Sequence, residues 1–252
     1  SKQYPQAQQV SSVNKILEDL SIQLIASAAI PSERAGIGVA AMRHGKDFMV
    51  DKPGFTTLEQ LEEVRLAQAE SKRIYSVCYC ERLFHPATVK AGELVQAGAI
   101  GRVIQTLGLG PHRLNAPARP AWFFQRARYG GILTDIGSHQ VDQFLFFTGA
   151  KTAEITLAQI ANFSHPEYPE LEDWGEMALS TAGATGYIRI DWFTPSGLGT
   201  WGDGRLILLG TDGYIEVRKN IDIAGRPGDN HLFLVDRKGI QYFDCKDVVC
   251  PY

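Results

Sequence analysis

Strand and helix signals alternate through the first third of the chain, and this alternation limits the fold more than any other feature. Apolar runs over residues 22–29, 47–53 and 73–80 have the length and composition of buried strands. Segments 31–43 and 56–71 between them are predicted helices, one opened by a proline and one with apolar residues at three- and four-residue spacing. Strands that alternate with helices form a parallel sheet, so we expect an α/β arrangement.

Two more features refine the helix predictions. Thr57 is placed to cap the second helix, with Gln60 completing a capping box. Short helices are also expected at residues 10–20 and 86–98.

The sequence changes character after about residue 103. Asp212-Gly213 between two apolar runs predicts a hairpin, and one helix is expected to begin near Asp135. Strand-like runs dominate this part, at residues 103–110, 188–193, 205–210, 214–219 and 231–236. The predicted fold class is therefore α/β plus α+β: a partial Rossmann-type parallel sheet followed by a domain with a large, open, mostly antiparallel sheet.

Gly36-Ile-Gly38-Val39-Ala40-Ala41 fits the pattern G-x-G-x-x-A of a dinucleotide-binding turn. However, the helix is already expected to start at Pro31, which places both glycines inside it. Asp51 also follows too soon, because the ribose-binding acid is expected about 20 residues on. We therefore interpret these glycines as sites of close helix–sheet packing.

Charge and composition exclude several partners. The net charge is −3 with a pI near 6.1, and lysines and arginines are scattered, so we expect no nucleic-acid partner. No apolar run approaches the roughly 18 residues of a membrane span, so no membrane partner is expected. The four cysteines, at positions 78, 80, 245 and 250, lack C-x-x-C spacing. Reduced thiols in a cytoplasmic protein are the favoured interpretation.

Asp51-Lys52-Pro53 stands at the carboxyl end of a predicted parallel strand, where open α/β sheets bind ligands. A lysine there can donate hydrogen bonds to a substrate oxygen and stabilise its ionised form. The proline would fix the backbone, including through a cis bond. The alternative is a solvated lysine at a strand end.

The stretch GGILTDIGSHQVD, residues 130–142, places Asp135 and His139 four residues apart on one predicted helical face. An acid beside an imidazole can orient the ring, stabilise its charged form and make it a proton shuttle. The alternatives are that Thr134 or Asp135 caps the helix and that His139 is a hydrogen-bonded core residue. The preceding glycine pair permits an unusual turn or a close approach to a ligand.

Four segments together resemble the glucose–fructose oxidoreductase / inositol dehydrogenase / rhizopine-catabolism family, also called Gfo/Idh/MocA. HGKDFMVDKP resembles the family's A-G-K-H-V-x-x-E-K-P, and GGILTDIGSHQVD matches its G-G-x-x-x-D-x-G-x-H-x-x-D. The matching segments are AAIPSERA (28–35), HGKDFMVDKP (44–53), ERLFHP with LVQAGAIGRV (81–86 and 94–103) and GGILTDIGSHQVD (130–142). They occur in family order, and the resemblance extends over nearly the whole chain from about residue 14.

The resemblance implies a two-domain oxidoreductase that uses NAD or NADP. Residues 1–82 would be the remainder of a Rossmann dinucleotide-binding domain, and residues 83–252 an α+β substrate and oligomerisation domain. The implied reaction moves a hydride between the cofactor and the carbinol carbon of a sugar, cyclitol or related polyol. The family also implies a homo-oligomer, a dimer or tetramer, formed through the open sheet.

Site residues follow from the same resemblance, which implies no metal ligand among them. Lys52, Asp135 and His139 match the family's active-site lysine, aspartate and acid/base histidine. Cofactor contacts are expected from Pro31, Asp51, Lys52 and Pro53, and substrate contacts from Arg82, Arg113, Trp122 and Arg126, with Arg128 a further candidate.

The sequence also departs from the family pattern. Asp51 stands where the family has glutamate, a shortening by one methylene that we expect to be tolerated. The family's first strand, its G-x-G-x-x-G turn, first helix and second strand are absent from this sequence, as is its usual closing segment. Two alternatives therefore stay open: a non-catalytic binding module derived from the family, and a metal-assisted lyase or hydrolase that uses His139 with carboxylates.

Overall fold

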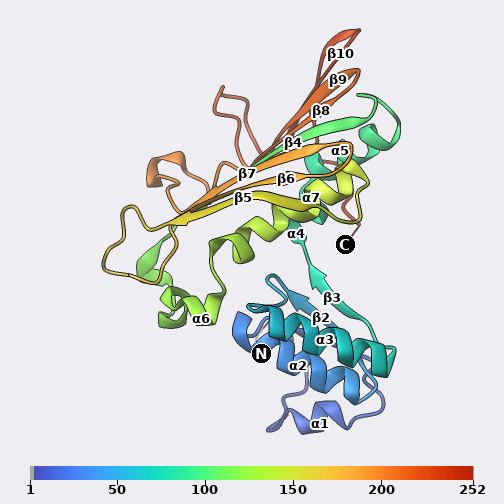
Figure 1. Cartoon of the computed structure of the whole chain (residues 1–252), viewed down its shortest axis with the longest axis vertical. Helices are drawn as coiled ribbons and strands as arrows, with labels where there is room; N and C mark the ends of the chain where they lie inside the picture. Colours follow the sequence, from blue (N-terminus) through green and yellow to red (C-terminus); the bar gives the residue numbers. More distant parts are fainter. Residues whose placement is uncertain (1–2, 252) are drawn as a thin grey trace. The chain divides into compact units, whose positions relative to one another are not determined.

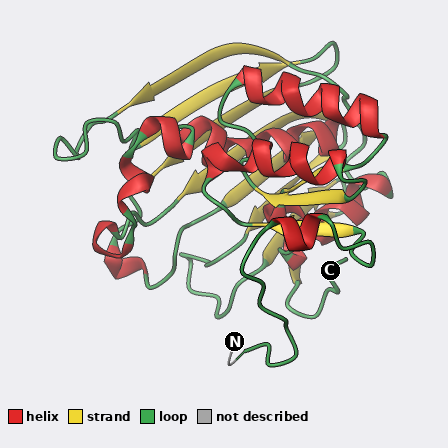
Figure 2. Cartoon of the chain, turned by 90° about the horizontal axis from the view of Figure 1, so that it is seen from below, coloured by secondary structure: helices red, strands yellow, loops and turns green. Residues whose placement is uncertain are grey.

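The computed structural model describes residues 3–251 and forms two compact units that divide between Cys78 and Tyr79 (Figure 1). Helices and strands occur throughout the chain (Figure 2). The first unit contains a small parallel sheet, and the second contains a large sheet of mostly antiparallel strands. The predicted fold class is confirmed.

The first unit is a parallel sheet of three strands in the order β1-β2-β3. Its elements are α1 (Asn14–Leu17), β1 (Leu24–Ser27), α2 (Pro31–Arg43), β2 (Asp47–Asp51), α3 (Leu58–Ser71) and β3 (Tyr75–Cys78). The predicted order of strands and helices is confirmed, and α2 has the predicted bounds. The helix expected at 10–20 is shorter than predicted, because only one turn of it forms.

The start of α3 follows the predicted cap with one change. Thr57 Oγ1 accepts a hydrogen bond from the Gln60 backbone N–H at 3.3 Å, as expected of the cap residue. The Gln60 side chain, however, accepts from the backbone N–H of Thr56 at 2.8 Å. The reciprocal half of the capping box is therefore displaced by one residue toward the N-terminus.

Only one of the two glycines in α2 is needed for packing. A Cβ atom at Gly38 would overlap the Tyr75 ring and lie 2.7 Å from Phe48 Cδ1, so the helix approaches the sheet closely here. A Cβ atom at Gly36 would meet no described atom within 4 Å. The packing interpretation is confirmed for Gly38 and wrong for Gly36.

The second unit is built on one sheet of eight strands in the order β11-β10-β9-β8-β4-β7-β6-β5. Its strands are β4 (Val103–Pro111), β5 (Glu154–Ala161), β6 (Trp174–Ser180), β7 (Thr185–Asp191), β8 (Arg205–Gly210), β9 (Gly213–Arg218), β10 (His231–Asp236) and β11 (Gly239–Asp244). Among these neighbours only β4 and β7 run parallel. The hairpin predicted at Asp212-Gly213 joins β8 and β9, whereas β5, β6 and β11 were not predicted.

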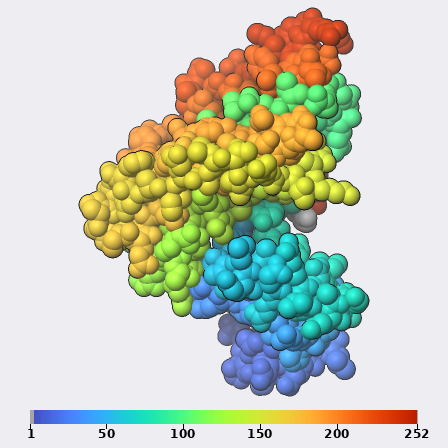
Figure 3. Space-filling model, viewed as in Figure 1, coloured from blue at the N-terminus to red at the C-terminus, as the bar shows by residue number. Residues whose placement is uncertain are grey.

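Helices α5 (Pro86–Gln96) and α7 (Ser138–Thr148) pack against this sheet. Ala87 and Ala91 of α5 are buried against β8, β9 and β10, and Phe144 of α7 is buried against β6 and β7. The alternate residues of these strands, among them Leu209, point to the opposite face. Strand β5 ends the sheet, and its yellow atoms lie at the surface (Figure 3).

Two general features complete the fold. Every helix within residues 3–251 is too short or too polar to span a bilayer. Cys78, Cys80, Cys245 and Cys250 are all free thiols.

The two helical glycines make a matched pair for a stability test. We expect Gly36→Ala to stabilise the chain by up to about 1 kcal/mol through helix propensity. Gly38→Ala gains the same propensity but must displace Tyr75 and Phe48, so a net loss of about 1–2 kcal/mol is expected. Urea-induced unfolding followed by circular dichroism measures both. Equal stability of the two variants would contradict the close packing at Gly38.

Candidate active site

The turn after β2 carries Lys52 and is held by a buried arginine. The Lys52–Pro53 peptide bond is cis, the isomer that the proline allowed. Arg34 of α2 is 5% exposed, and its Nη1 donates to the carbonyls of Asp51 at 2.9 Å, Lys52 at 2.5 Å and Pro53 at 2.9 Å. Its Nε donates to the carbonyl of Ala29 at 2.7 Å. One guanidinium therefore fixes the backbone of the whole turn.

The side chains of this turn lie at the carboxyl ends of parallel strands. Asp51 Oδ1 accepts a hydrogen bond from the Lys52 backbone N–H at 2.9 Å, and Asp51 pairs with Cys78 across β2 and β3. Burial, and then the Asp51 charge, raise the pKa of the Cys78 thiol. Pro31, the first residue of α2, is buried. All four residues predicted to contact a cofactor thus belong to the first unit, either at this strand end or at the start of α2.

The glycine pair before α7 forms an unusual turn. Gly130 and Gly131 have φ angles of +92° and +93°, which side chains rarely adopt. A Cβ atom at Gly131 would lie 2.6 Å from Glu172 Oε2 and 2.7 Å from Arg126 Cζ. Glu172 in turn accepts hydrogen bonds from the Ile132 backbone N–H at 2.7 Å and from Arg126 Nε at 2.5 Å. Of the two uses expected for the glycines, the unusual turn is confirmed.

Asp135 and His139 lie on either side of a change in helix type. Residues Leu133–Gly137 form a single π-helical turn that continues directly into α7. The Asp135 backbone N–H donates to the Gly131 carbonyl at 2.9 Å. Gly137 keeps this turn against the sheet, because a Cβ atom there would lie 2.7 Å from Met177 Cε. π-Helical turns occur frequently at functional sites.

The helix-cap alternative for this stretch is wrong. Helix α7 has Gly137 in the N-cap position in a helical conformation, and no side chain caps either α7 or the π turn. Thr134 and Asp135 are therefore not helix caps, since the chain is already helical before it reaches them. The π turn itself has no clear signal in the sequence.

His139 is buried, with 3% of its surface exposed, and its ring stands edge-on to Tyr79 with centroids 6.1 Å apart. Its charge is linked to that of Glu81 on α4 (Cys80–Leu83). Burial opposes ionisation of Glu81, but Lys219, and then His139 and His112, hold the pKa of this carboxyl well below its ordinary value. A buried imidazole near an ionised carboxylate suits both an acid/base group and a core histidine.

Asp135 also acts on charged and polar neighbours. Burial lowers the pKa of Arg119, and the Asp135 charge partly opposes this. Burial is also the main cause of the raised pKa of Tyr129. The hydrogen bond with the Glu172 backbone opposes this rise, and the charges of Glu172 and Asp135 add to it. The carboxylate thus lies half-buried, and Arg119 and Tyr129 are among the groups that its charge reaches.

Two of the predicted substrate contacts are held in ion pairs. Arg82 Nε lies 2.6 Å from Asp142 Oδ2, its Nη2 donates to Oδ1 at 3.2 Å, and its guanidinium covers the Phe146 ring at 4.7 Å. Arg126 is paired with Glu172, as described above. Arg82 therefore joins α4 to α7, and a substrate role for either arginine stays a prediction.

The other two predicted contacts lie in the loop that follows β4. Arg113 Nη2 donates to the carbonyl of Thr200 at 2.8 Å and to that of Ser196 at 3.2 Å, so it holds a neighbouring loop. Trp122 packs edge-on to Phe123, with ring centroids 6.1 Å apart. Their contact with a substrate also stays a prediction.

Two grooves flank the π turn, and both are lined by Leu133, Thr134 and Ala158. The larger, of about 360 Å³, also involves Tyr79 and Asp142 among mostly apolar residues. The smaller, of about 230 Å³, adds the polar groups of Arg126 and Glu172 and the glycine turn. These grooves have room for small polar molecules beside the Asp135–His139 segment. Within residues 3–251 no cluster of three His, Cys, Asp or Glu side chains is arranged to hold a metal ion.

A small parallel α/β unit joined to a large open sheet, with an acid–imidazole segment on a helix against that sheet, defines a two-part α/β plus α+β protein. The sequence model of the GFO/IDH/MocA C-terminal domain matches residues 88–216. The chain belongs to the GFO/IDH/MocA family, as the sequence motifs predicted.

Known relatives agree with this family. The chain is 27% identical over 237 residues to scyllo-inositol 2-dehydrogenase (NAD(+)) of Bacillus subtilis, covering 90% of this chain and 62% of the relative. It is 28% identical over 183 residues to levoglucosan dehydrogenase of Pseudarthrobacter phenanthrenivorans, covering 70% of this chain and 46% of the relative. The chain thus spans less than two thirds of the length of either enzyme.

Solved structures share the fold. The crystal structure of a putative oxidoreductase from Erwinia carotovora atroseptica is 51% identical, with a TM-score of 0.93 over 95% of this chain and 72% of that chain. Levoglucosan dehydrogenase in complex with NADH and levoglucosan superposes with a TM-score of 0.77 at 21% identity, covering 96% of this chain and 68% of that chain.

The turn that carries Lys52 yields a direct test. Arg34→Met removes the donor to the carbonyls of Ala29, Asp51, Lys52 and Pro53 and leaves several of them unpaired, so we expect a loss of about 3 kcal/mol in unfolding free energy. Faster hydrogen exchange at residues 47–54 should accompany this loss.

The control is Arg65→Met, which removes an exposed arginine paired with Glu62 and should change stability by less than about 0.5 kcal/mol. Urea unfolding and peptide-level hydrogen exchange measure both variants. Unchanged exchange at residues 47–54 in Arg34→Met would show that the guanidinium does not hold this turn.

Proposed function

We propose that the protein is an NAD(P)-dependent dehydrogenase that acts on a CH–OH group of a sugar, cyclitol or related polyol. The observation that carries the proposal is the Asp135–His139 segment, a π turn leading into a helix that buries an imidazole near an ionised carboxylate. The names of the inositol and levoglucosan dehydrogenases among its relatives support this class of reaction. We propose residues 1–82 as part of the dinucleotide-binding domain and residues 83–252 as the substrate and oligomerisation domain.

Each proposed catalytic residue has one task. His139 takes the proton of the substrate hydroxyl, because an imidazole exchanges protons near neutral pH. Asp135 orients this imidazole and stabilises its charged form. Lys52 donates to the same substrate oxygen and stabilises the negative charge that develops on it. Burial of His139 supports this division, since a water-excluded site strengthens these interactions.

The first unit fits part of a nicotinamide dinucleotide site. The Asp51-Lys52-Pro53 turn lies at the carboxyl ends of β2 and β3, the edge at which open α/β sheets bind such ligands. Pro31, Asp51, Lys52 and Pro53 would contact the cofactor there, and Arg34 keeps their backbone in place. When bound, the cofactor supplies the hydride acceptor, and NAD and NADP are equal candidates.

Substrate recognition is proposed for Arg82, Arg113, Trp122 and Arg126. Arg126 fits this role best, because it lines the smaller groove beside the π turn with about half of its side chain exposed. Arg126 gives the groove hydrogen-bond donors and its partner Glu172 gives it acceptors, and recognition of a polyol requires both. We further propose that the protein acts in the cytoplasm.

The first functional test replaces the proposed acid/base group. His139→Asn should abolish turnover with NAD or NADP while leaving NADH affinity within about threefold of the unmodified protein, because the proposed cofactor contacts lie elsewhere. Fluorescence titration with NADH and NADPH measures binding, and polyol-dependent reduction of NAD(P) measures turnover.

The matched control is His44→Gln, which changes an exposed histidine at the end of α2 and should leave both quantities unaltered. Full turnover by His139→Asn would refute the assignment of the acid/base group. Folded protein that binds neither NADH nor NADPH would favour the non-catalytic binding module instead.

We also propose that the protein forms a homo-oligomer through the open face of its large sheet. Leu209 is exposed on the face of β8 opposite to α5, and Leu107 of β4 points to the same side. Apolar residues at the centre of a sheet face, away from its covering helices, are typical of association surfaces.

A charged side chain in this face should separate the subunits. We expect Leu209→Glu to reduce the mass measured by light scattering from that of a dimer or tetramer to that of one chain, because the carboxylate would be buried without a partner. Leu58→Glu places the same charge on the exposed surface of α3 and serves as the control. An unmodified chain that is monomeric at micromolar concentration would contradict the proposal.

A further inference from the structure

We infer that Glu81, Gln140, Gln143 and Lys219 form a closed ring of buried hydrogen bonds that positions His139. This inference rests on the proposed function only for the role of His139 as acid/base group. The ring joins α4, α7 and the residue that follows β9, segments that lie far apart in the sequence.

The ring is complete within the second unit. Lys219 Nζ donates to Glu81 Oε2 at 2.6 Å and to Gln143 Oε1 at 3.0 Å. Gln140 Nε2 donates to the same oxygen of Glu81 at 3.0 Å, and Gln143 Nε2 lies 3.5 Å from Gln140 Oε1. Gln143 Nε2 also donates to the backbone carbonyl of His139 at 3.0 Å. This last hydrogen bond links the ring to His139, the residue proposed to move the proton.

The two charges of the ring determine how both amides point. An ammonium group only donates, so Gln143 must present its oxygen to Lys219, which turns its NH2 group toward the His139 carbonyl. A carboxylate only accepts, so Gln140 must present its NH2 group to Glu81, which leaves its oxygen for Gln143. Reversing either amide would place two donors or two acceptors against each other.

The fold makes room for this ring and keeps water away from three of its four side chains, while the Glu81 side chain is 13% exposed. Gln140, Gln143 and Lys219 are each at most 2% exposed. Gly108 and Gly110 of β4 accommodate the Gln140 side chain, since a Cβ atom at Gly108 would lie 2.6 Å from its Oε1 and one at Gly110 3.3 Å from its Nε2. In such surroundings an unmade hydrogen bond is costly, so the ring has one favoured arrangement.

A buried ion pair is a poor means of gaining stability. Removing two charges from water costs more than their attraction commonly returns, and apolar residues of similar volume stabilise as well or better. The pair instead orients the amides: Lys219 turns the Gln143 NH2 group toward the carbonyl of His139. The Glu81 carboxylate acts on the imidazole through its charge. The other titratable or charged groups around the ion pair and His139 are Tyr79, Arg82, His85, His112, Asp142 and Asp229. Asp135 precedes His139 by four residues in the π turn.

The first experiment measures the titration of His139 and needs no cofactor. In Glu81→Gln the side chain keeps its size and still accepts a hydrogen bond from Lys219, but the negative charge near the imidazolium is lost. We expect the pKa of His139, followed by NMR of labelled histidine and assigned with His139→Asn, to fall by about 1 unit. The acid limb of the kcat/KM profile should move to lower pH by the same amount.

The second experiment separates positioning from stability. The double variant Glu81→Leu with Lys219→Met replaces the ion pair by apolar groups and should fold with at least the original stability. Gln143→Met removes the hydrogen bonds of this side chain to the His139 carbonyl, Lys219 and Gln140, and leaves the Glu81–Lys219 ion pair in place. We expect both to lower kcat roughly tenfold or more with KM changed less than about threefold, because the imidazole is displaced and not removed.

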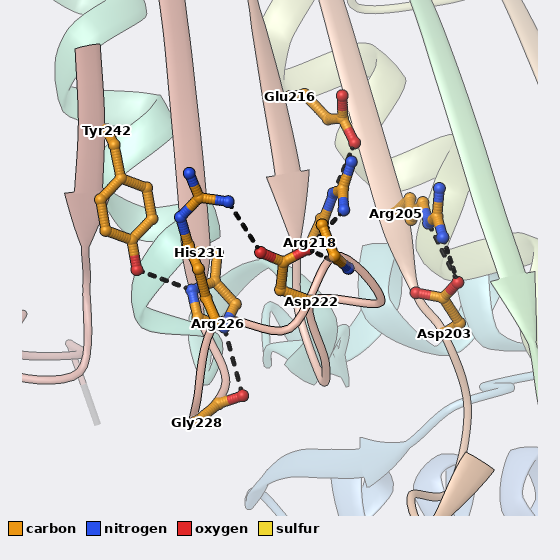
Figure 4. A network of polar contacts seen from close by, with 10 residues as sticks. Asp203, Arg205, Glu216, Arg218, Asp222, Arg226, Gly228, His231 and Tyr242 are labelled. Carbon is orange, nitrogen blue, oxygen red and sulfur yellow. Dashed lines mark hydrogen bonds and ion pairs between the residues drawn. The ribbon is translucent and has the colours of Figure 1, made fainter. Parts of the chain in front are cut away.

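The control breaks the ion pairs of another buried carboxylate, whose two arginine partners are more exposed than Lys219. Asp222 pairs with Arg218 at 2.5 Å and with Arg226 at 3.0 Å, in the network that also contains Glu216 and Tyr242 (Figure 4). Asp222→Asn should lower stability and leave the His139 titration and kcat unchanged.

Two results would overturn the inference: an unaltered His139 titration in Glu81→Gln, or unaltered kcat in both the double variant and Gln143→Met. Turnover that survives in His139→Asn would refute the proposed function instead, and the NMR titration would still decide whether the ring acts on His139.

Discussion

The close approach of the segment from Ile132 to Thr148 to the large sheet determines where Asp135 and His139 lie within the second unit. Side chains of this segment fill positions where the sheet has none: Phe144 lies against Gly186, and Gln140 against Gly108. On the helical side, Gly137 has no side chain, and this leaves room for the Met177 side chain of the sheet. Larger residues at these glycines would push the helix away from the sheet, and Asp135 and His139 would move with it. The π turn lies within this segment and continues directly into α7.

Side chains bind the backbone of the proposed site residues at three separate places, by the same kind of interaction. Arg34 holds the carbonyls around Lys52, and Glu172 holds the backbone N–H that follows the glycine turn. Gln143, oriented by Lys219, holds the carbonyl of His139. In each case a buried side chain binds a main-chain group within or beside a sequence motif. Arg34 and Glu172 are themselves charged, and Gln143 is oriented by the charge of Lys219. Arg34 belongs to the AAIPSERA segment, whereas Glu172, Gln143 and Lys219 lie outside the motifs. The motif residues are thus kept in place partly by residues that the motifs do not include.

Sequence patterns correctly predicted those features of the fold that depend on residues close together in the chain. The bounds of α2, the cap of α3 and the hairpin between β8 and β9 depend on residues close together in sequence, and all three were predicted. The motifs also located the Lys52 turn and the Asp135–His139 segment. The partners could not be found in this way, because 138 residues separate Lys219 from Glu81 and 40 separate Glu172 from Ile132. The expected cap of α7 was wrong for a related reason: packing on the sheet makes the chain helical before Thr134, whatever local capping would favour.

The buried charges also explain why mutations that stabilise the protein at this site should impair its proposed function. Replacing Glu81 and Lys219 with apolar residues would remove two desolvated charges, and the free energy of unfolding would be unchanged or greater. The amides of Gln140 and Gln143 would then have no charge to orient them, and the side-chain donor to the His139 carbonyl would no longer be fixed in direction. Selection for stability alone would therefore favour an apolar core beneath α7. That the sequence instead has a carboxylate, an ammonium group and two amides there is best understood if the direction of hydrogen bonds, and not their number, is what the site requires.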